Sequence, residues 1–340
     1  MTRIPVHEAL AGLHDYDTVI DVRSPSEWSL DHLPGAINAP ALSDAERTTI
    51  GTLYATSAFE AKKRGAALVA RNIARALDEQ FIERPRDWRP LVYCWRGGNR
   101  SLAMATVMER IGWKVHVLEG GYAAYRKFVI ADLALHVARL RYVVVCGVTG
   151  SGKTAYLRQL RDQGEQVLDL EGLAHHRGSL LGNEPTGQQP SQKQFESRIW
   201  DNLRQYSEDR PVFVESESKK IGAVQVPDPL IARMRESPCI ELSPPLDERV
   251  AFLCQDYAHF FEQPDVLRAQ LERLKPLVGE KRLSAWMQLI DAQRWPELVA
   301  SLLADHYDPT YTASMRRNYR DYAHATRREG HPGLAAPSKA

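Results

Sequence analysis

Short apolar runs alternate with stretches of helical spacing along the first third of the chain. The segments TVIDVRS (18–24), LVYC (91–94) and KVHVLEGG (114–121) each predict a short buried strand, and the third ends in a glycine turn. Between the first two strands, AALVARNIARALDEQFI has the spacing of a helix. Strands that alternate with helices of this length predict a parallel α/β sheet, in which functional residues gather at the carboxyl ends of the strands.

The same alternation begins again after an amphipathic stretch near residues 126–139, which we interpret as the joint between two domains. YVVVC (142–146), EQVLDLEG (165–172) and PVFVESES (211–218) predict the strands of a second α/β unit. From about residue 246 the spacing becomes helical. We predict an α/β domain at 1–130, a helical connector at 131–139, a second α/β domain at 140–245, a mainly helical part at 246–332 and a frayed tail at 333–340.

The composition fits a two-domain globular protein. Its 340 residues exceed what one hydrophobic core usually fills, and 44% of them are apolar and 26% charged. No apolar run approaches the roughly 18 residues that a membrane span needs, and the N-terminus has no apolar core of signal-peptide length. We therefore expect a cytoplasmic protein with no membrane contact.

The spacing of cysteine and histidine argues against a structural metal site. The four cysteines lie far apart and form no C-x-x-C pair, so we expect free thiols rather than disulfides or a zinc site. His175 and His176 are adjacent rather than spaced for one face of a helix, which disfavours a metal site there.

Cys94 follows the second predicted strand and opens the segment CWRGGNRS, the cysteine loop. A thiolate is stabilised by a helix N-terminus, backbone N–H groups and guanidinium groups, and this segment offers all three. Glycines can aim successive amides inward, and an arginine can neutralise an oxyanion. We predict a nucleophilic Cys94 with Arg96 or Arg100 in an anion-binding loop; the alternative is a buried structural cysteine. The other candidate loop residues are Trp95, Gly97, Gly98, Asn99 and Ser101.

Three segments of the first domain resemble the signatures of a rhodanese domain: VIDVRSPSEWSLDHLPGAINAP, YCWRGGNRS and LEGGYAAYR. The resemblance implies a rhodanese-like α/β fold and a role for Cys94 in chalcogen transfer. It implies structural roles for Asp21, Arg23 and His32. Five residues separate Cys94 from Arg100, one more than in ordinary sulfurtransferases. This is the C-x5-R spacing of related phosphatases, so the loop is sized for a phosphate-like anion.

The second domain opens with a phosphate-binding motif. GVTGSGKT (147–154, the phosphate loop) matches G-x-x-x-x-G-K-[ST] at every position and follows an apolar run, which is the context of a P-loop NTPase-like fold. Its glycines let amides approach phosphates, Lys153 bridges them, and Thr154 can hold Mg²⁺. Glu215 is a candidate partner for the metal or the donor. A nucleotide is the usual ligand, but any diphosphate ester presents the same oxygens. The candidate phosphate-binding residues are Gly147, Thr149, Gly150, Ser151, Gly152, Lys153 and Thr154.

The two domains in this order, followed by the segments HRGS and QPSQK, resemble bacterial tRNA 2-selenouridine synthases. The resemblance implies a transferase that acts on wobble 2-thiouridine of tRNA. It would first alkylate the sulfur with geranyl diphosphate and then introduce selenium from selenophosphate, with no need for ATP hydrolysis. We assign the diphosphate to the phosphate loop and selenophosphate to the cysteine loop, and the opposite assignment stays open. Cys94 would either capture selenium covalently or position the selenophosphate for attack, and the sequence does not separate these two routes. An enzyme that supplies selenophosphate is a further expected partner.

Candidate contacts for tRNA or donor oxygens are basic residues outside these two loops. For each of them the alternative is a solvated surface side chain. Trp95 is expected near a substrate. The rival functions are a C-x5-R phosphatase and a P-loop kinase, or nucleotide-gated binding protein, with a regulatory rhodanese module. The basic candidates are His176, Arg177, Lys193, Lys219, Arg316 and Arg317.

Overall fold

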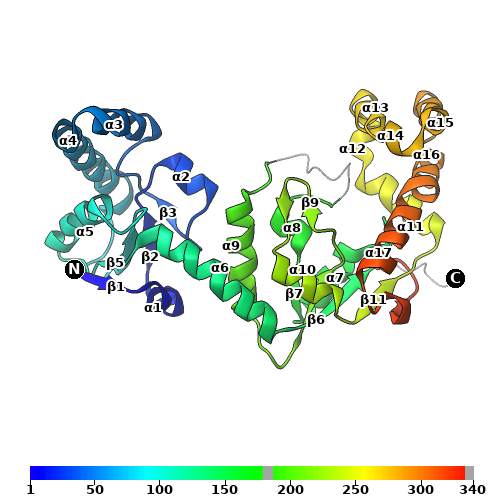
Figure 1. Cartoon of the computed structure of the whole chain (residues 1–340), viewed down its shortest axis with the longest axis horizontal. Helices are drawn as coiled ribbons and strands as arrows, with labels where there is room; N and C mark the ends of the chain where they lie inside the picture. The colour runs from blue at the N-terminus through cyan, green and yellow to red at the C-terminus, as the bar shows by residue number, and fades with distance from the viewer. Residues whose placement is uncertain (179–186, 334–340) are drawn as a thin grey trace. The chain divides into compact units, whose positions relative to one another are not determined.

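The computed structural model describes residues 1–178 and 187–333, which form two compact units, each with its own sheet (Figure 1). The first unit contains residues 1–133 and 190–201, and the second contains the rest of the described chain. Residues 190–201 therefore belong to the first unit, although they follow the phosphate loop in sequence. Residues 334–340 of the predicted frayed tail lie outside the described residues.

The first unit has a five-stranded sheet in which every pairing is parallel. The predicted parallel α/β fold is therefore confirmed, and the three predicted strands become β2, β4 and β5. Two very short strands complete the sheet at its edges. The strand order is β1 (Thr2–Ile4), β5 (His116–Leu118), β4 (Pro90–Tyr93), β2 (Thr18–Asp21) and β3 (Ile37–Asn38).

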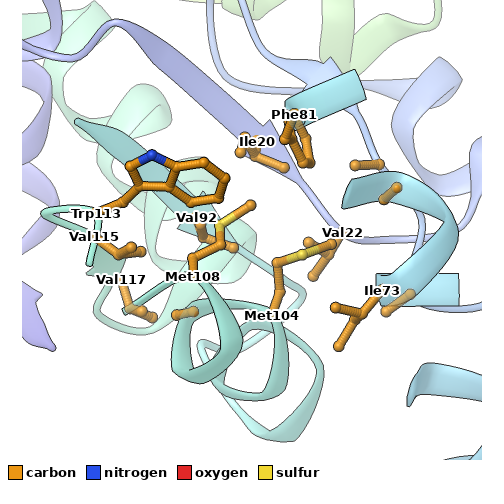
Figure 2. Close-up of a cluster of buried hydrophobic side chains, with 14 of the residues drawn as sticks. Ile20, Val22, Ile73, Phe81, Val92, Met104, Met108, Trp113, Val115 and Val117 are labelled. Carbon is orange, nitrogen blue, oxygen red and sulfur yellow. The ribbon is translucent and has the colours of Figure 1, made fainter. Parts of the chain in front are cut away.

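Helices cover this sheet, and its core is apolar. Figure 2 shows Met104 and Met108 pointing into a buried cluster with Val92 and Trp113. The two methionines are four residues apart, so they lie on one face of their helix. The helices are α1 (Val6–Ala11), α2 (Pro25–Leu30), α3 (Asp44–Thr56), α4 (Ala58–Ala76), a π-helix (Leu77–Phe81), α5 (Asn99–Ile111), α6 (Gly121–Arg139) and α9 (Gln192–Leu203), with a 3-10 turn at Leu13–Asp15. From residue 134 in α6 and residue 202 in α9, these two helices belong to the second unit.

The second unit also contains a five-stranded parallel sheet. The three strands predicted from the sequence are neighbours in it and run from its centre to one edge. The strand order is β12 (Thr326–Arg328), β11 (Cys239–Leu242), β6 (Arg141–Cys146), β8 (Pro211–Glu215) and β7 (Gln166–Leu168). A small antiparallel pair joins β9 (Lys220–Ile221) and β10 (Val224–Gln225). Helices α7 (Lys153–Asp162), α8 (Leu170–Ala174) and α10 (Asp228–Arg235) accompany the sheet.

The C-terminal part is mainly helical, as predicted, before the chain returns to the sheet as β12. Trp286 is fully buried in its core, and the indole N–H donates to Ser301 Oγ at 2.9 Å. The helices are α11 (Leu246–Asp256), α12 (Ala258–Phe261), α13 (Pro264–Glu272), α14 (Lys275–Val278), α15 (Glu280–Asp291), α16 (Trp295–Leu302), a π-helix (Leu303–Tyr307) and α17 (Asp308–Asn318), with a 3-10 turn at Tyr322–His324.

Two further findings concern membrane contact and cysteine chemistry. Within the described ranges, no helix is both long enough and apolar enough to cross a bilayer. All four cysteines are free thiols, three of them buried, as the sequence predicts.

Candidate functional site

The cysteine loop lies at the carboxyl end of β4, since the strand ends at Tyr93 and α5 begins at Asn99. The Cys94 side chain is only 3% exposed. Its Sγ accepts the Gly98 main-chain N–H and the Ser101 hydroxyl, both at 3.2 Å. The Ser101 hydroxyl also lies 3.0 Å from the Gly98 carbonyl oxygen, so the sulfur and that oxygen share its single proton. The loop therefore surrounds the Cys94 sulfur with hydrogen-bond donors and covers it almost completely.

The turn after β5 fixes the conformation of this loop. Tyr122 and Ala123 donate their main-chain N–H groups to the carbonyls of Cys94 and Trp95, both at 2.9 Å. A Cβ on Gly121 would lie within 2.6 Å of the Gly97 nitrogen, so a side chain does not fit at that position. Gly97 itself has φ of +63°, a conformation that favours glycine. The close approach explains why the segment LEGGY accompanies the cysteine loop.

The loop arginines differ in their surroundings. Arg100 is partly buried and its Nη1 donates to Glu27 Oε2 at 3.2 Å, which holds the guanidinium at α2. Arg96 is exposed, and Trp95 beside it is 37% exposed with its ring 5.3 Å from that of Tyr122. Arg96 and Trp95 are therefore open to a ligand at the loop surface, as is the exposed Asn99.

Asp21 and Arg23 form a buried structural pair. Their side chains are at most 1% exposed and meet at 2.6 Å, and the Arg23 guanidinium lies over the Tyr122 ring at 3.9 Å. His32 stacks on Trp28 with ring centroids 4.5 Å apart. These contacts fit the structural roles that the rhodanese resemblance implies.

Asp31 is a fully buried carboxyl near the cysteine loop. Its Oδ2 accepts the hydroxyl of Tyr122 at 2.9 Å and that of Ser197 in α9 at 3.1 Å. Within the described part of the chain Oδ1 has no partner. Burial raises the pKa of the Asp31 carboxyl. Its two partners come from positions 91 and 166 residues away, so no local motif could have identified it.

The phosphate loop lies at the carboxyl end of β6 and leads directly into α7. Gly147, Gly150 and Gly152 all have positive φ, as the motif requires. A Cβ on Gly147 would come within 2.9 Å of the Leu242 carbonyl oxygen. Lys153 Nζ donates to the Gly147 carbonyl at 2.9 Å, which positions the ammonium over the loop.

Above this loop lies a cavity of about 940 Å³, the phosphate cavity. It is lined by the six consecutive loop residues 149–154, and Arg177, Lys219 and Arg317 reach the same cavity. Arg177 pairs with Asp256 at 2.6 Å, and Lys219 pairs with Asp228 at 2.6 Å. The volume suits a small phosphorylated ligand, since ligand pockets commonly span about 300–1,000 Å³.

The other predicted contacts do not line this cavity. His176 is buried and its Nδ1 accepts the Gly178 N–H at 3.1 Å. Lys193 is exposed on α9 and belongs to the first unit, with its carbonyl accepting from Arg126. Arg316 is exposed on α17, next to Arg317 in sequence. Of the six basic candidates, the structure therefore brings three together at the phosphate cavity: Arg177, Lys219 and Arg317.

Three glutamates lie near Thr154. Glu215 ends β8, is only 2% exposed, and accepts the Glu171 main-chain N–H at 2.7 Å; burial raises its pKa well above the ordinary value. Glu171 and Glu217 line the phosphate cavity, and burial raises their pKa values too. Glu171 Oε2 accepts the Thr154 hydroxyl at 3.3 Å. The cavity-facing acids are therefore Glu171 and Glu217, with Glu215 behind them.

These residues fit a magnesium ion that is shared with phosphates. Mg²⁺ is commonly bound through one or two carboxylates with substrate phosphates and water, so a three-ligand protein cage is not needed. Thr154 and Glu171 offer such a partial set beside the phosphate loop. Among the described residues there is no group of three or more His, Cys, Asp or Glu side chains that could hold a metal ion.

Two residues from the helical part fix the phosphate loop. Tyr311 is in α17, and its hydroxyl accepts the Gly147 N–H at 2.8 Å and hydrogen bonds with Ser216 Oγ at 2.7 Å. Arg249 in α11 donates to the Thr149 carbonyl at 3.1 Å and pairs with Asp308 at 2.7 Å. The C-terminal helices therefore hold the loop in addition to its own sheet connections.

Two family models match the chain: a rhodanese-like domain at residues 5–128 and a tRNA 2-selenouridine synthase AAA domain at residues 140–330. The tRNA 2-selenouridine synthase of Marinobacter nauticus is 32% identical over 329 residues and covers 86% of this chain and 87% of that protein. The tRNA 2-selenouridine synthase of Aeromonas salmonicida is 32% identical over 342 residues, which cover 92% of this chain and 91% of that protein. Among solved structures, a rhodanese-related protein from Thermoplasma volcanium is 21% identical, with TM-score 0.26, covering 37% of this chain and 92% of that chain.

Proposed function

Because the chain belongs to the tRNA 2-selenouridine synthase family, we propose that it converts 2-thiouridine at the wobble position of tRNA anticodons to 2-selenouridine. The protein is an enzyme of tRNA modification. The proposed route has two steps: S-geranylation of the thiouridine with geranyl diphosphate, then replacement of the geranylthio group with selenium from selenophosphate.

The observation that carries this proposal is the presence of two glycine-containing loops of different chemistry, each at the carboxyl end of a parallel strand. One presents a thiol that accepts two hydrogen bonds, and the other presents phosphate-loop amides and Lys153 beside a large cavity. Both proposed donors are phosphorylated anions. A route with two such donors gives each loop a ligand without requiring nucleotide hydrolysis.

In the alkylation step, the sulfur of 2-thiouridine attacks C1 of the geranyl group. The C1–O bond breaks, the diphosphate leaves with the bonding electrons, and the N3 proton of the thiouridine passes to the diphosphate or to water. Negative charge grows on the leaving oxygens, and the loop amides and Lys153 stabilise it most strongly in the transition state. Mg²⁺ held by Thr154 and Glu171 would supply further charge neutralisation.

In the selenation step, selenium of selenophosphate attacks C2 of the S-geranylated base. The geranylthio group leaves with the C–S electron pair, and water cleaves the P–Se bond to give phosphate. Cys94 and Arg96 position the selenophosphate. A selenium atom bound covalently to Cys94 would instead need an oxidant, because selenium in selenophosphate is already at the selenide level. We therefore favour positioning over covalent capture.

The tRNA contacts in this proposal are basic and aromatic. Arg317 lines the phosphate cavity, and Arg316 is exposed beside it on α17. Trp95, exposed at the cysteine loop, offers a face on which an unstacked anticodon base can lie. Phosphate contacts of this kind make binding fall with salt.

Nucleoside analysis tests the proposal. Purified protein is incubated with 2-thiouridine tRNA, geranyl diphosphate and selenophosphate, and the digested nucleosides are measured by mass spectrometry. We expect S-geranyl-2-thiouridine with geranyl diphosphate alone and 2-selenouridine when both donors are present. tRNA with uridine at the wobble position is the control and should stay unmodified. Unchanged 2-thiouridine, with release of phosphate from an aryl phosphate or rapid nucleoside triphosphate turnover, would favour the phosphatase or kinase instead.

A further inference from the structure

A second, smaller cavity lies among the C-terminal helices, and we call it the apolar pocket. Its volume is about 50 Å³, and its walls are almost wholly carbon. Residues of α11, α12, α13 and α16 line it: Leu253, Phe260, Phe261, Leu267, Leu298 and Leu302. A pocket of this kind favours a hydrocarbon, because a polar group placed there would lose its hydrogen bonds to water without replacement.

The apolar pocket adjoins the phosphate cavity. Thr149, Leu253, Tyr257 and Tyr307 line both. Thr149 belongs to the phosphate loop itself, and Leu253 packs so close to the loop that a Cβ on Gly150 would come within 2.8 Å of it. A ligand whose phosphates rest on the loop therefore has an apolar recess within reach of its other end.

Tyr307 gives this junction a polar group that is not satisfied by the protein. Its hydroxyl is buried, and within the described residues it has no hydrogen-bond partner. It ends the π-helix Leu303–Tyr307 between α16 and α17, a helical irregularity that is frequent at functional sites. A buried hydroxyl without a partner is costly, and an ester oxygen of a bound ligand would relieve that cost.

From these observations we propose that the apolar pocket receives the far end of the isoprenoid chain of a diphosphate ester whose phosphates lie on the phosphate loop. This proposal rests on the proposed function, since that function names geranyl diphosphate as the donor. The pocket is too small for the whole geranyl chain, so the first carbons lie in the phosphate cavity beside Leu253 and Tyr257. Each methylene removed from water strengthens binding about fourfold. The base of a nucleotide would leave its polar edges unpaired in the same place.

The test compares the affinities of geranyl diphosphate and inorganic pyrophosphate, measured by calorimetry on the full chain. Wild type should bind geranyl diphosphate about 100-fold more tightly than pyrophosphate. Val299→Phe fills the pocket from α16. It should reduce the affinity ratio of geranyl diphosphate to pyrophosphate from about 100-fold to about tenfold or less, while pyrophosphate affinity stays within twofold of wild type. Val266→Phe makes the same change at an exposed position of α13 outside the pocket and should behave as wild type.

A second variant keeps the test decisive if Val299→Phe misfolds and loses pyrophosphate binding as well. Phe261→Ala enlarges the pocket and should shift the preference toward the longer farnesyl diphosphate by about tenfold. Two results overturn the pocket assignment alone. One is an unchanged affinity ratio of geranyl diphosphate to pyrophosphate in a Val299→Phe protein that still binds pyrophosphate. The other is an unchanged preference between geranyl and farnesyl diphosphate in Phe261→Ala. Failure of wild type to bind either diphosphate contradicts the proposed function of the phosphate loop itself, and the pocket assignment falls with it.

Discussion

The hydroxyl of Tyr311 accepts the main-chain N–H of Gly147 at 2.8 Å, although 164 residues separate the two in sequence. The first glycine of the phosphate loop is therefore held by a helix from the C-terminal part. This contact makes the shape of the loop depend on the fold of the helices that follow the sheet.

Tyr311→Phe removes the acceptor and leaves the Gly147 N–H buried without it. An unsatisfied buried donor costs about 1–3 kcal/mol, so we expect the Tm to fall by about 2–12 °C. Pyrophosphate affinity should fall about fivefold because the loop is no longer fixed. Tyr206→Phe is the matched control, since the Tyr206 hydroxyl donates to the Val167 carbonyl at 2.7 Å, and Tyr206 does not line the phosphate cavity. That variant should lose stability but not affinity. Equal affinity losses in both variants would contradict a positioning role for Tyr311.

Ser101→Ala should slow the reaction of Cys94 with iodoacetamide at pH 7 by about two- to tenfold. The Ser101 hydroxyl donates to the sulfur at 3.2 Å, and a hydrogen bond contributes about 0.5–1.5 kcal/mol, which corresponds to roughly two- to tenfold in rate. Peptide mapping by mass spectrometry isolates Cys94 from the other three thiols. Ser29→Ala, at an exposed site on α2, is the control. An unchanged rate in Ser101→Ala would show that the hydroxyl does not assist the reaction of the sulfur.

Glu215 makes stability depend on pH. Burial raises the pKa of its carboxyl well above the ordinary value of 4.5, so the folded protein keeps a proton that the unfolded chain releases. The stability that the protonated Glu215 contributes below pH 4.5 is therefore lost as the pH rises toward the pKa of Glu215 in the folded protein. Glu215→Gln cannot ionise and keeps an oxygen for the Glu171 N–H.

We expect the free energy of unfolding of Glu215→Gln to match wild type near pH 5 and to exceed it increasingly toward pH 8, by up to about 1.4 kcal/mol for each pH unit. Thermal unfolding across this range measures the difference, with Glu208→Gln at an exposed position as the control. A constant difference between wild type and Glu215→Gln across the range would mean that Glu215 is ionised in the folded protein.

Arg316 and Arg317 should contribute to tRNA binding through phosphates. Replacing both with Gln should weaken affinity and reduce the slope of log affinity against log salt by about one for each tRNA phosphate that the variant no longer neutralises. Filter binding at several salt concentrations measures both quantities. Arg71→Gln, a change at an exposed site in the first unit, serves as the control. A slope that stays the same in the double variant would exclude these residues from the docking surface.

The sequence predicted what local pattern encodes. Six strands, including β4 and β6, are recognisable as apolar runs, and the two loops that follow β4 and β6 carry compact motifs. The short strand β3 has two residues and β12 is exposed throughout, so neither has the apolar signal on which the prediction relies. Tertiary pairing, rather than propensity, places them in the sheets.

The supporting residues could not be predicted for a related reason. Asp31, Arg249 and Tyr311 act through partners between 59 and 166 residues away, and single-sequence spacing carries no information about such contacts. The grouping of α9 with the first unit is another case, because the buried Trp200 donates to Asp132 Oδ2 at 2.9 Å, across 68 residues. Charge patterning alone likewise did not separate the cavity-facing Arg177 from the buried His176 next to it.

The most direct test of the central claim is the nucleoside profile produced by Lys153→Ala and Cys94→Ala from 2-thiouridine tRNA with geranyl diphosphate, with and without selenophosphate. If the phosphate loop drives alkylation and the cysteine loop drives selenation, Lys153→Ala loses both products. Cys94→Ala then accumulates S-geranyl-2-thiouridine and forms no 2-selenouridine. Loss of the S-geranyl product in Cys94→Ala, or its undiminished formation in Lys153→Ala, would contradict this division of labour.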